Sequence, residues 1–190
     1  GEMAVLDQNK VRSASIVAAT PVTLCAIDEN LFHEFLIAED RVEEMRNLWR
    51  SRSELEKFHP FSEFSDAVND RIARNSLRMR VTAGETLVEQ GKNDGEFFII
   101  LSGEFRVTHN GVEVKTLKGG DMFGEYGSLA DSVRNATVTA VRDSVVLEVT
   151  RGEIRKVIES APIFNFCMRE IMIQRSRELK KLEQKKRQLA

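Results

Sequence analysis

The sequence predicts a mainly β domain of the α+β class: a small antiparallel β-barrel or jelly roll with helices before and after it. Residues 78–149 read as short strands, separated by turn signals at the spacing typical of all-β sandwiches and barrels. Asn110-Gly111 lies between two strand-like segments, which strongly favours a two-residue hairpin. Helical periodicity precedes these strands and returns from Arg151 onward.

Composition limits the class of protein and its setting. At 190 residues, 42% of them hydrophobic, the chain suits one large domain or two small ones with a core. The net charge of −2 provides no overall attraction to nucleic acid or membrane, so we expect neither as a partner. Two cysteines, Cys25 and Cys167, make no disulfide framework, and we expect a cytoplasmic location. No apolar run approaches the length of a membrane span.

The stretch from residue 28 to residue 80 reads as helical. Asp28 is a candidate N-cap. Apolar residues at helical spacing follow it in two groups: Leu31, Phe32 and Phe35, then Val42, Met45 and Trp49. His59-Pro60 interrupts the pattern, and a further helix near residues 64–77 leads into the strands.

Two strand signals stand out within residues 78–149. Residues 97–101 are a continuous apolar run, which is typical of a strand buried on both faces. Residues 104–109 and 112–117 flank Asn110-Gly111, and we expect them to pair as a hairpin.

Two more helices are predicted after the strands, with Pro162 between them. Ile154, Val157 and Ile158 mark the first helix. The second covers about residues 163–188, and its apolar face needs a covering, either the mouth of the barrel or a partner protein such as a second copy in a homodimer. The members of that face are Phe164, Met168, Ile171, Met172, Leu179 and Leu182. The basic residues at the end of this helix are better explained as cations that interact favourably with the helix dipole than as a binding patch for nucleic acid or membrane.

Residues 119–138 hold the candidate binding site. A short helix that opens after Gly124 directs free backbone N–H groups outward, which favours an anion. Arg134 can add a two-pronged, charge-assisted contact to the same anion. Glu125 suits a ligand that also presents a hydroxyl donor. A phosphate, an arginine and a carboxylate for a sugar hydroxyl together describe a cyclic nucleotide, in which only the 2′-OH is free to donate.

This pattern resembles a known family. Phe-Gly-Glu at residues 123–125, followed by Arg-x-Ala-Thr-Val at 134–138, resembles the phosphate-binding cassette of the cyclic-nucleotide-binding domain family. The glycine framework before it is also similar: Ala83-Gly84-Glu85, Gly91 and residues 97–103. The resemblance covers roughly residues 60–180 and implies that Glu125 takes the ribose hydroxyl and Arg134 the cyclic phosphate. The nucleotide-binding residues it implies are Gly124, Glu125, Tyr126, Ser128, Leu129, Arg134, Asn135 and Ala136.

Two positions bear on how such a site would work. The family usually has a bulky apolar hinge residue three positions after the glutamate, where this chain has Ser128, with Leu129 one position later. We therefore expect weaker coupling between ligand and helix movement. Relatives that prefer cyclic GMP often carry a hydroxyl residue directly after the arginine. Asn135 occupies that position here, and its amide oxygen can also accept from guanine. The ligand can therefore be cyclic AMP or cyclic GMP, and the tandem arrangement of cassettes slightly favours cyclic AMP.

Residues 1–36 repeat the cassette. Gly1-Glu2 precedes Arg12-Ser13 as Gly124-Glu125 precedes Arg134-Asn135, and the two arginines are 122 positions apart. A repeat of this length indicates a duplicated domain. We expect residues 1–36 to be the C-terminal part of a first cyclic-nucleotide-binding domain, with a remnant site at Gly1, Glu2, Arg12 and Ser13. Residues 37–77 would be a helical linker and entry helix, and residues 78–190 the second, complete domain.

Tandem cassettes joined by helices most resemble the regulatory subunits of cyclic-AMP-dependent protein kinases, followed by the regulatory half of cyclic-GMP-dependent kinases. The resemblance implies a nucleotide-sensing module that moves its flanking helices to control a protein kinase catalytic subunit or domain. The alternative is a fold that has lost nucleotide sensing and acts as an interaction module. There is no Walker loop, CxxC pair or HExxH motif, so we expect no enzyme activity, no catalytic or metal-binding residues, and no cofactor besides the cAMP or cGMP ligand.

Overall fold

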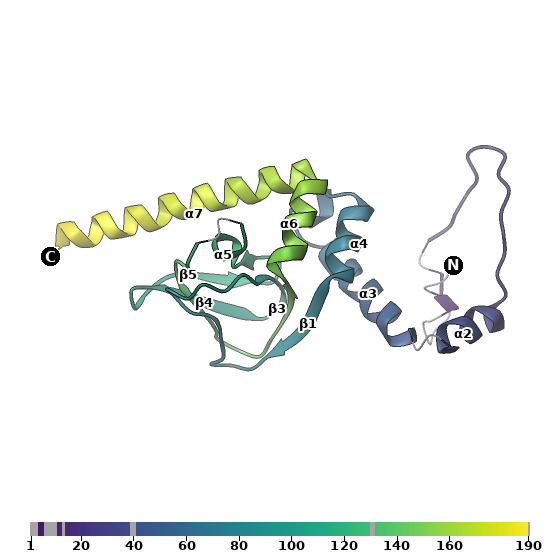
Figure 1. Ribbon diagram of the computed structural model, residues 1–190, viewed down its shortest axis with the longest axis horizontal. Helices are drawn as coiled ribbons and strands as arrows, with labels where there is room; N and C mark the ends of the chain where they lie inside the picture. Colours follow the sequence, from purple (N-terminus) through teal and green to yellow (C-terminus); the bar gives the residue numbers. More distant parts are fainter. Residues whose placement is uncertain (1–3, 6–10, 13, 39–40, 130–131, 190) are drawn as a thin grey trace. The chain divides into compact units, whose positions relative to one another are not determined.

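The computed structural model describes residues 4–5, 11–12, 14–38, 41–129 and 132–189, which form two compact units, Gly1–Arg50 and Ser51–Ala190 (Figure 1). In the first unit, Asp28 caps helix α2 (Glu29–Ala38), because its carboxylate accepts from the Asn30 amide at 2.8 Å. This confirms the predicted N-cap. Residues 14–28 contain no helix or strand and are exposed. Helix α3 (Val42–Leu55) begins in the first unit and ends in the second.

Two four-stranded antiparallel sheets build the second unit. One has the order β1 (Ser76–Val81), β8 (Ser144–Val149), β3 (Phe97–Ser102), β6 (Met122–Phe123). The other has the order β2 (Thr86–Val88), β7 (Thr137–Ala140), β4 (Glu104–His109), β5 (Val112–Lys118). Because the two sheets remain separate, the fold is a jelly roll with flanking helices rather than a closed barrel.

The hydrophobic core lies between the sheets. Its buried members are Val81, Val88, Phe98, Ile100, Phe105, Leu117, Phe123, Val138, Ala140 and Val146. The Phe123 ring stacks on Phe98 at 4.9 Å between centroids and meets Phe105 at 5.3 Å. Residues 97–101 are all buried, as the continuous apolar run predicted. The predicted hairpin is also confirmed, because Asn110 and Gly111 both have positive φ angles, 50° and 74°, between β4 and β5.

Helices come both before and after the jelly roll along the chain. A 3₁₀ turn η1 (Phe61–Glu63) and helix α4 (Asp66–Arg74) precede it, and α6 (Arg151–Ser160) and α7 (Pro162–Leu189) follow it. The helix expected near residues 64–77 ends early, because Ser76 and Leu77 pair with β8 as part of strand β1. Pro162 is the first residue of α7, so it does separate the two C-terminal helices as predicted.

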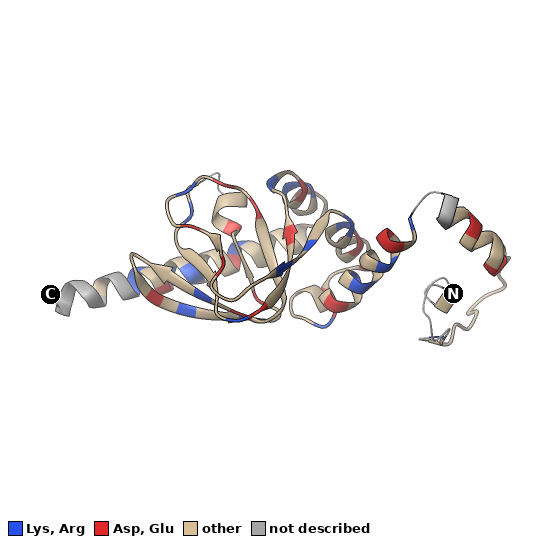
Figure 2. Cartoon of the chain, turned by 90° about the horizontal axis from the view of Figure 1, so that it is seen from below, with Lys and Arg blue, Asp and Glu red and all other residues tan. Residues whose placement is uncertain are grey.

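The beginning of α7 is anchored by aromatic contacts. Phe164 is fully buried and its ring lies 5.3 Å from Phe64, which in turn meets Phe61 edge to face at 5.9 Å. Arg52 ties the end of α3 to α4 through Asp66 and Asp70, at 2.9 and 3.1 Å. Acidic and basic side chains are interspersed along the described chain, in keeping with its small net charge (Figure 2).

Replacing Phe105 by alanine should lower the free energy of unfolding by about 3–5 kcal/mol, because the ring is fully buried between the sheets and the change leaves a cavity. Urea unfolding followed by circular dichroism measures this. Phe166→Ala is the matched control, since that ring is 61% exposed on α7 and should change stability by less than about 0.5 kcal/mol. Equal losses in the two variants would contradict the assignment of the core.

Candidate functional site

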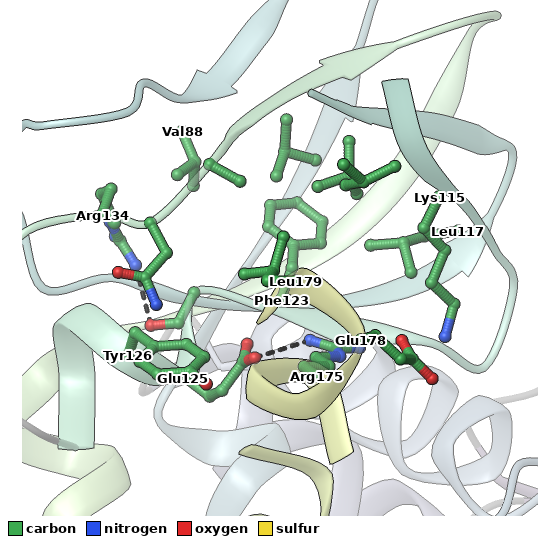
Figure 3. A pocket seen from close by; sticks show the side chains of 16 residues that line it. Val88, Lys115, Leu117, Phe123, Glu125, Tyr126, Arg134, Arg175, Glu178 and Leu179 are labelled. Atoms are coloured by element: carbon green, nitrogen blue, oxygen red, sulfur yellow. Dashed lines mark hydrogen bonds and ion pairs between the residues drawn. The ribbon is translucent and has the colours of Figure 1, made fainter. Parts of the chain in front are cut away.

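A pocket of about 90 Å³ opens between the β2–β7–β4–β5 sheet, the short helix α5 (Glu125–Leu129) and α7 (Figure 3). Its walls are largely apolar: Val88, Val107, Val114, Leu117, Phe123, Val138 and Leu179. Its polar side chains are Lys115, Glu125, Tyr126, Arg134, Asn135, Arg175 and Glu178. An apolar cavity with a few converging polar groups is the usual form of a small-molecule site.

Arg134 is the most constrained of these polar side chains, with 2% of its surface exposed. Its Nε pairs with the Asp94 carboxylate, while Nη1 and Nη2 donate to the carbonyl oxygens of Gly124 and Glu96, each at 2.7 Å. The Glu96 carboxylate lies 3.6 Å from Nη2. These bonds use three of the five guanidinium N–H groups and fix the plane of the group.

Gly124 allows this arrangement. It has a φ angle of 91°, which favours glycine, and a Cβ there would lie 2.5 Å from the Glu96 carbonyl oxygen and 2.8 Å from Arg134 Nη1. Both the turn and the close approach of the arginine therefore exclude a side chain. Gly124, which the sequence analysis predicted before the short helix, is therefore needed both for its backbone conformation and for the close contacts with Glu96 and Arg134.

Glu125 is buried and its carboxylate is paired with α7. Its Oε1 lies 2.9 Å from Nη1 of Arg175, and Arg175 Nη2 also donates to the Met122 carbonyl oxygen at 2.6 Å. Figure 3 shows the two side chains pointing toward each other. Next to them, the Tyr126 hydroxyl donates to the Met172 carbonyl oxygen at 2.8 Å, and burial raises the pKa of this phenol. Helix α5 is therefore held to α7 by two polar contacts.

Six of the eight residues predicted for the second site line this pocket: Gly124, Glu125, Tyr126, Arg134, Asn135 and Ala136. Ser128 does not; it is fully buried, and its hydroxyl donates to the Gly124 carbonyl oxygen at 2.8 Å. Leu129 ends α5, and its side chain lies outside the described residues. Of the predicted remnant site, Gly1, Glu2 and Ser13 lie outside the described residues, and Arg12 is exposed in a segment without helix or strand.

Sequence reasoning missed the charged residues that α7 contributes. Arg175 and Glu178 line the pocket together with Leu179, and only Leu179 was predicted, as part of the apolar face of this helix. A signal was present, because Arg175 lies seven residues after Met168 and three after Met172, within the apolar stripe. A cation that is buried with such a stripe needs a carboxylate as its partner.

The carbonyl of Asn135 is also held in place. His109 Nδ1 lies 2.6 Å from the Asn135 carbonyl oxygen, which makes Nδ1 the protonated nitrogen and leaves Nε2 to accept from the Asn110 amide at 3.1 Å. The β4–β5 hairpin thereby supports the loop that follows Arg134.

Within the part of the chain that the structure describes, no cluster of three or more His, Cys, Asp or Glu side chains is placed to hold a metal ion. None of its helices is long and apolar enough to cross a membrane.

Known proteins are similar to this chain in sequence and in fold. The profile of the cyclic nucleotide-binding domain matches residues 78–161. The regulatory subunit of cAMP-dependent protein kinase from Yarrowia lipolytica is 32% identical over 142 residues, which cover 74% of this chain and 36% of that subunit. Residues 78–161 therefore belong to the cyclic nucleotide-binding domain family.

A curated kinase and a solved structure are also similar to this chain. The cGMP-dependent protein kinase 2 of Mus musculus is 31% identical over 164 residues, which cover 80% of this chain and 20% of the kinase. A solved structure described as Sp-2Cl-cAMPS bound to PKAR CBD2 has the same fold, with a TM-score of 0.66 at 20% identity over 73% of this chain and 92% of that one. The chain thus spans well under half of the curated relatives it matches.

Asp94→Asn should lower the free energy of unfolding by about 1–3 kcal/mol, because it removes the charge that balances a buried guanidinium while keeping the shape of the side chain. Chemical unfolding at neutral pH measures the loss. Glu113→Gln is the matched control, an exposed carboxylate on β5 whose neutralisation should change little. A wild-type midpoint in Asp94→Asn would show that Arg134 does not need this partner.

Proposed function

We propose that the second unit binds a cyclic mononucleotide in the pocket between α5, α7 and the jelly roll, and that the ligand rearranges the flanking helices to control a protein kinase. The observation that carries the proposal is the convergence of Arg134 and Glu125 on one apolar pocket, beside a glycine turn that admits no side chain. A fixed guanidinium, a buried carboxylate and an apolar cavity suit a ligand with one phosphate charge, one hydroxyl donor and a flat base.

Each part of the nucleotide has a proposed partner. The cyclic phosphate is assigned to Arg134 and the first-turn amides of α5, and the ribose 2′-OH to the Glu125 carboxylate. The base would then extend toward Lys115 and Glu178, which lie at the end of the pocket away from Arg134 (Figure 3). A lysine and a glutamate offer a donor and an acceptor to either purine, and Asn135 offers both, so cAMP and cGMP remain alternatives.

Helix α7 is proposed as the moving part. At about 90 Å³ the pocket is much smaller than the roughly 300–1,000 Å³ typical of small-molecule sites, and α7 forms one of its walls. We therefore expect a bound nucleotide to displace α7, and a ligand hydroxyl at Glu125 would compete with Arg175. Ser128, whose hydroxyl turns back to the Gly124 carbonyl, offers α5 no bulky apolar contact, and we propose that coupling is correspondingly weak.

The kinase partner is proposed from the relatives, which are named as regulatory subunits of cAMP-dependent protein kinase and as cGMP-dependent kinases. In this role the chain would have no catalytic activity of its own. A catalytic subunit or domain would bind the flanking helices, and a second copy of the chain along α7 is the alternative partner. The ligand can favour release of such a partner only by its different affinity for the two helix positions.

Residues 1–36 are proposed to be the end of a first cyclic-nucleotide-binding domain, followed by a linker over 37–77 and the complete domain over 78–190. The repeated sequence pattern supports this reading, because Gly1-Glu2 precedes Arg12-Ser13 as Gly124-Glu125 precedes Arg134-Asn135. Nucleotide binding should therefore occur at one site per chain.

The second candidate function is an interaction module that does not sense nucleotides. It is favoured by the observation that the two side chains assigned to the nucleotide are already paired, Arg134 with Asp94 and Glu125 with Arg175. Binding measurements separate the two functions directly.

Titration calorimetry with cAMP and cGMP should show one nucleotide per chain, and Arg134→Ala should weaken binding by about 2–5 kcal/mol, because the phosphate loses its partner in a half-buried site. Arg134→Lys should also weaken it, since an ammonium cannot replace the planar fork. Arg142→Ala is the matched control, an arginine that is 62% exposed and outside the pocket.

Equal nucleotide affinities in wild type and Arg134→Ala would show that Arg134 does not bind the phosphate, provided that circular dichroism shows both proteins folded. Two nucleotides per chain would contradict the incomplete first site. A 2′-deoxy analogue that binds wild type as tightly as the parent nucleotide would remove the role given to Glu125.

Saturating nucleotide should change amide hydrogen exchange across residues 151–185 as well as at residues 119–138, because we expect a bound nucleotide to displace α7. Exchange detected by mass spectrometry at neutral pH reports this. The matched control is nucleotide added to Arg134→Ala at a concentration well below its weakened Kd. Protection confined to residues 119–138 would mean that the domain binds without switching.

A further inference from the structure

The loop Asp94-Gly95-Glu96 lies between two arginines from different parts of the chain. On one side, Arg134 pairs with the Asp94 carboxylate and donates to the Glu96 carbonyl oxygen. On the other side, Nη2 of Arg151 donates to the Asp94 carbonyl oxygen at 3.2 Å. Arg151 is the first residue of α6. One three-residue loop therefore contacts both the arginine of the pocket and the beginning of a flanking helix.

Gly95 has no room for a side chain because of Arg151. A Cβ at position 95 would overlap the guanidinium, 2.8 Å from Cζ, and would lie 2.9 Å from the Arg151 Cβ. Gly84, Gly91 and Gly111 are different, since their positive φ angles favour glycine although nothing lies near a Cβ there. At Gly95 the reason is steric: the Arg151 side chain packs directly over the loop backbone.

We propose that Arg151 is a positioning residue for Arg134. It holds the loop from outside, and the loop in turn holds the guanidinium through the Asp94 carboxylate and the Glu96 carbonyl. The Glu96 carboxylate stays within the loop, where it accepts from the Gly95 amide at 3.1 Å, and lies 3.6 Å from Arg134. The consequence for phosphate binding rests on the proposed function, whereas the positioning of Arg134 does not.

The same contact makes α6 sensitive to the pocket. The Arg151 side chain can keep its place over Gly95 only while the start of α6 keeps its position relative to the loop. A ligand that pulls Arg134 away from Asp94 therefore shifts the loop against Arg151. In the opposite direction, a displacement of α6 moves Arg151, which releases the loop and weakens its bonds to Arg134. Such reciprocity is required of any equilibrium coupling between two sites.

The test observes Arg134 itself, in the full chain without ligand. The Nε–H of Arg134, bonded to Asp94, should give a slowly exchanging resonance in ¹⁵N NMR, assigned by its loss in Arg134→Lys. Gly95→Ala and Arg151→Gln should each accelerate exchange of this proton with water about tenfold, because a charge-assisted bond is weakened. Arg151→Gln removes the contact without adding volume, so it remains informative where Gly95→Ala does not fold.

Gly152→Ala is the matched control. It lies next to Arg151 in α6, and a Cβ there meets nothing within 4 Å. Its Arg134 resonance should equal that of the wild type.

Calorimetry on the same variants gives the second readout, with Kd for cAMP or cGMP expected to rise about tenfold in Gly95→Ala and Arg151→Gln but not in Gly152→Ala. An unchanged Arg134 resonance in both Gly95→Ala and Arg151→Gln would overturn the inference. A responsive resonance in a protein that binds neither nucleotide would support the positioning of Arg134 and overturn the proposed function instead.

Discussion

The burial of one guanidinium is the constraint on which the rest of the second unit depends. Arg134 is 2% exposed, and a buried cation is tolerated only when charge and hydrogen bonds surround it. Asp94 provides the charge, and the carbonyls of Gly124 and Glu96 provide the bonds. The close fit continues at Gly127, where a Cβ would lie 2.6 Å from the Asp94 carbonyl oxygen and 2.9 Å from Arg134 Nη1. The turn before α5, the helix itself and the loop after β2 are thus all shaped around a single side chain.

The pocket is continuous with the hydrophobic core. Val88, Leu117, Phe123 and Val138 belong both to the cluster between the sheets and to the pocket wall. A ligand that places an apolar surface there would complete the core rather than occupy a separate cavity. Such a ligand would also raise the free energy of unfolding, because a ligand that binds only the folded state stabilises that state.

Features with local signals could be predicted from the sequence, and features made by distant contacts could not. The Asn110-Gly111 hairpin, the Asp28 cap and the break at Pro162 each depend on a few neighbouring residues, and each is present. Within the candidate site, Arg134 and Glu125 could be found because they belong to one short pattern. Asp94, forty residues before Arg134, and Arg175, fifty after Glu125, depend on how the sheets and α7 come together, which no local pattern specifies. The early end of α4 has the same origin, since pairing with β8 draws Ser76 and Leu77 into a strand.

Helix α7 has a mechanical property that follows from its length alone. Its 28 residues, Pro162–Leu189, correspond to about 42 Å of continuous helix, and it extends well past the sheets (Figure 1). Phe164 anchors one end, and Arg175 lies near the midpoint. Any tilt of the helix about the aromatic cluster would therefore displace its parts in proportion to their distance from Phe164. A tilt of about ten degrees would move Arg175 by about 3 Å and the far end by about 7 Å.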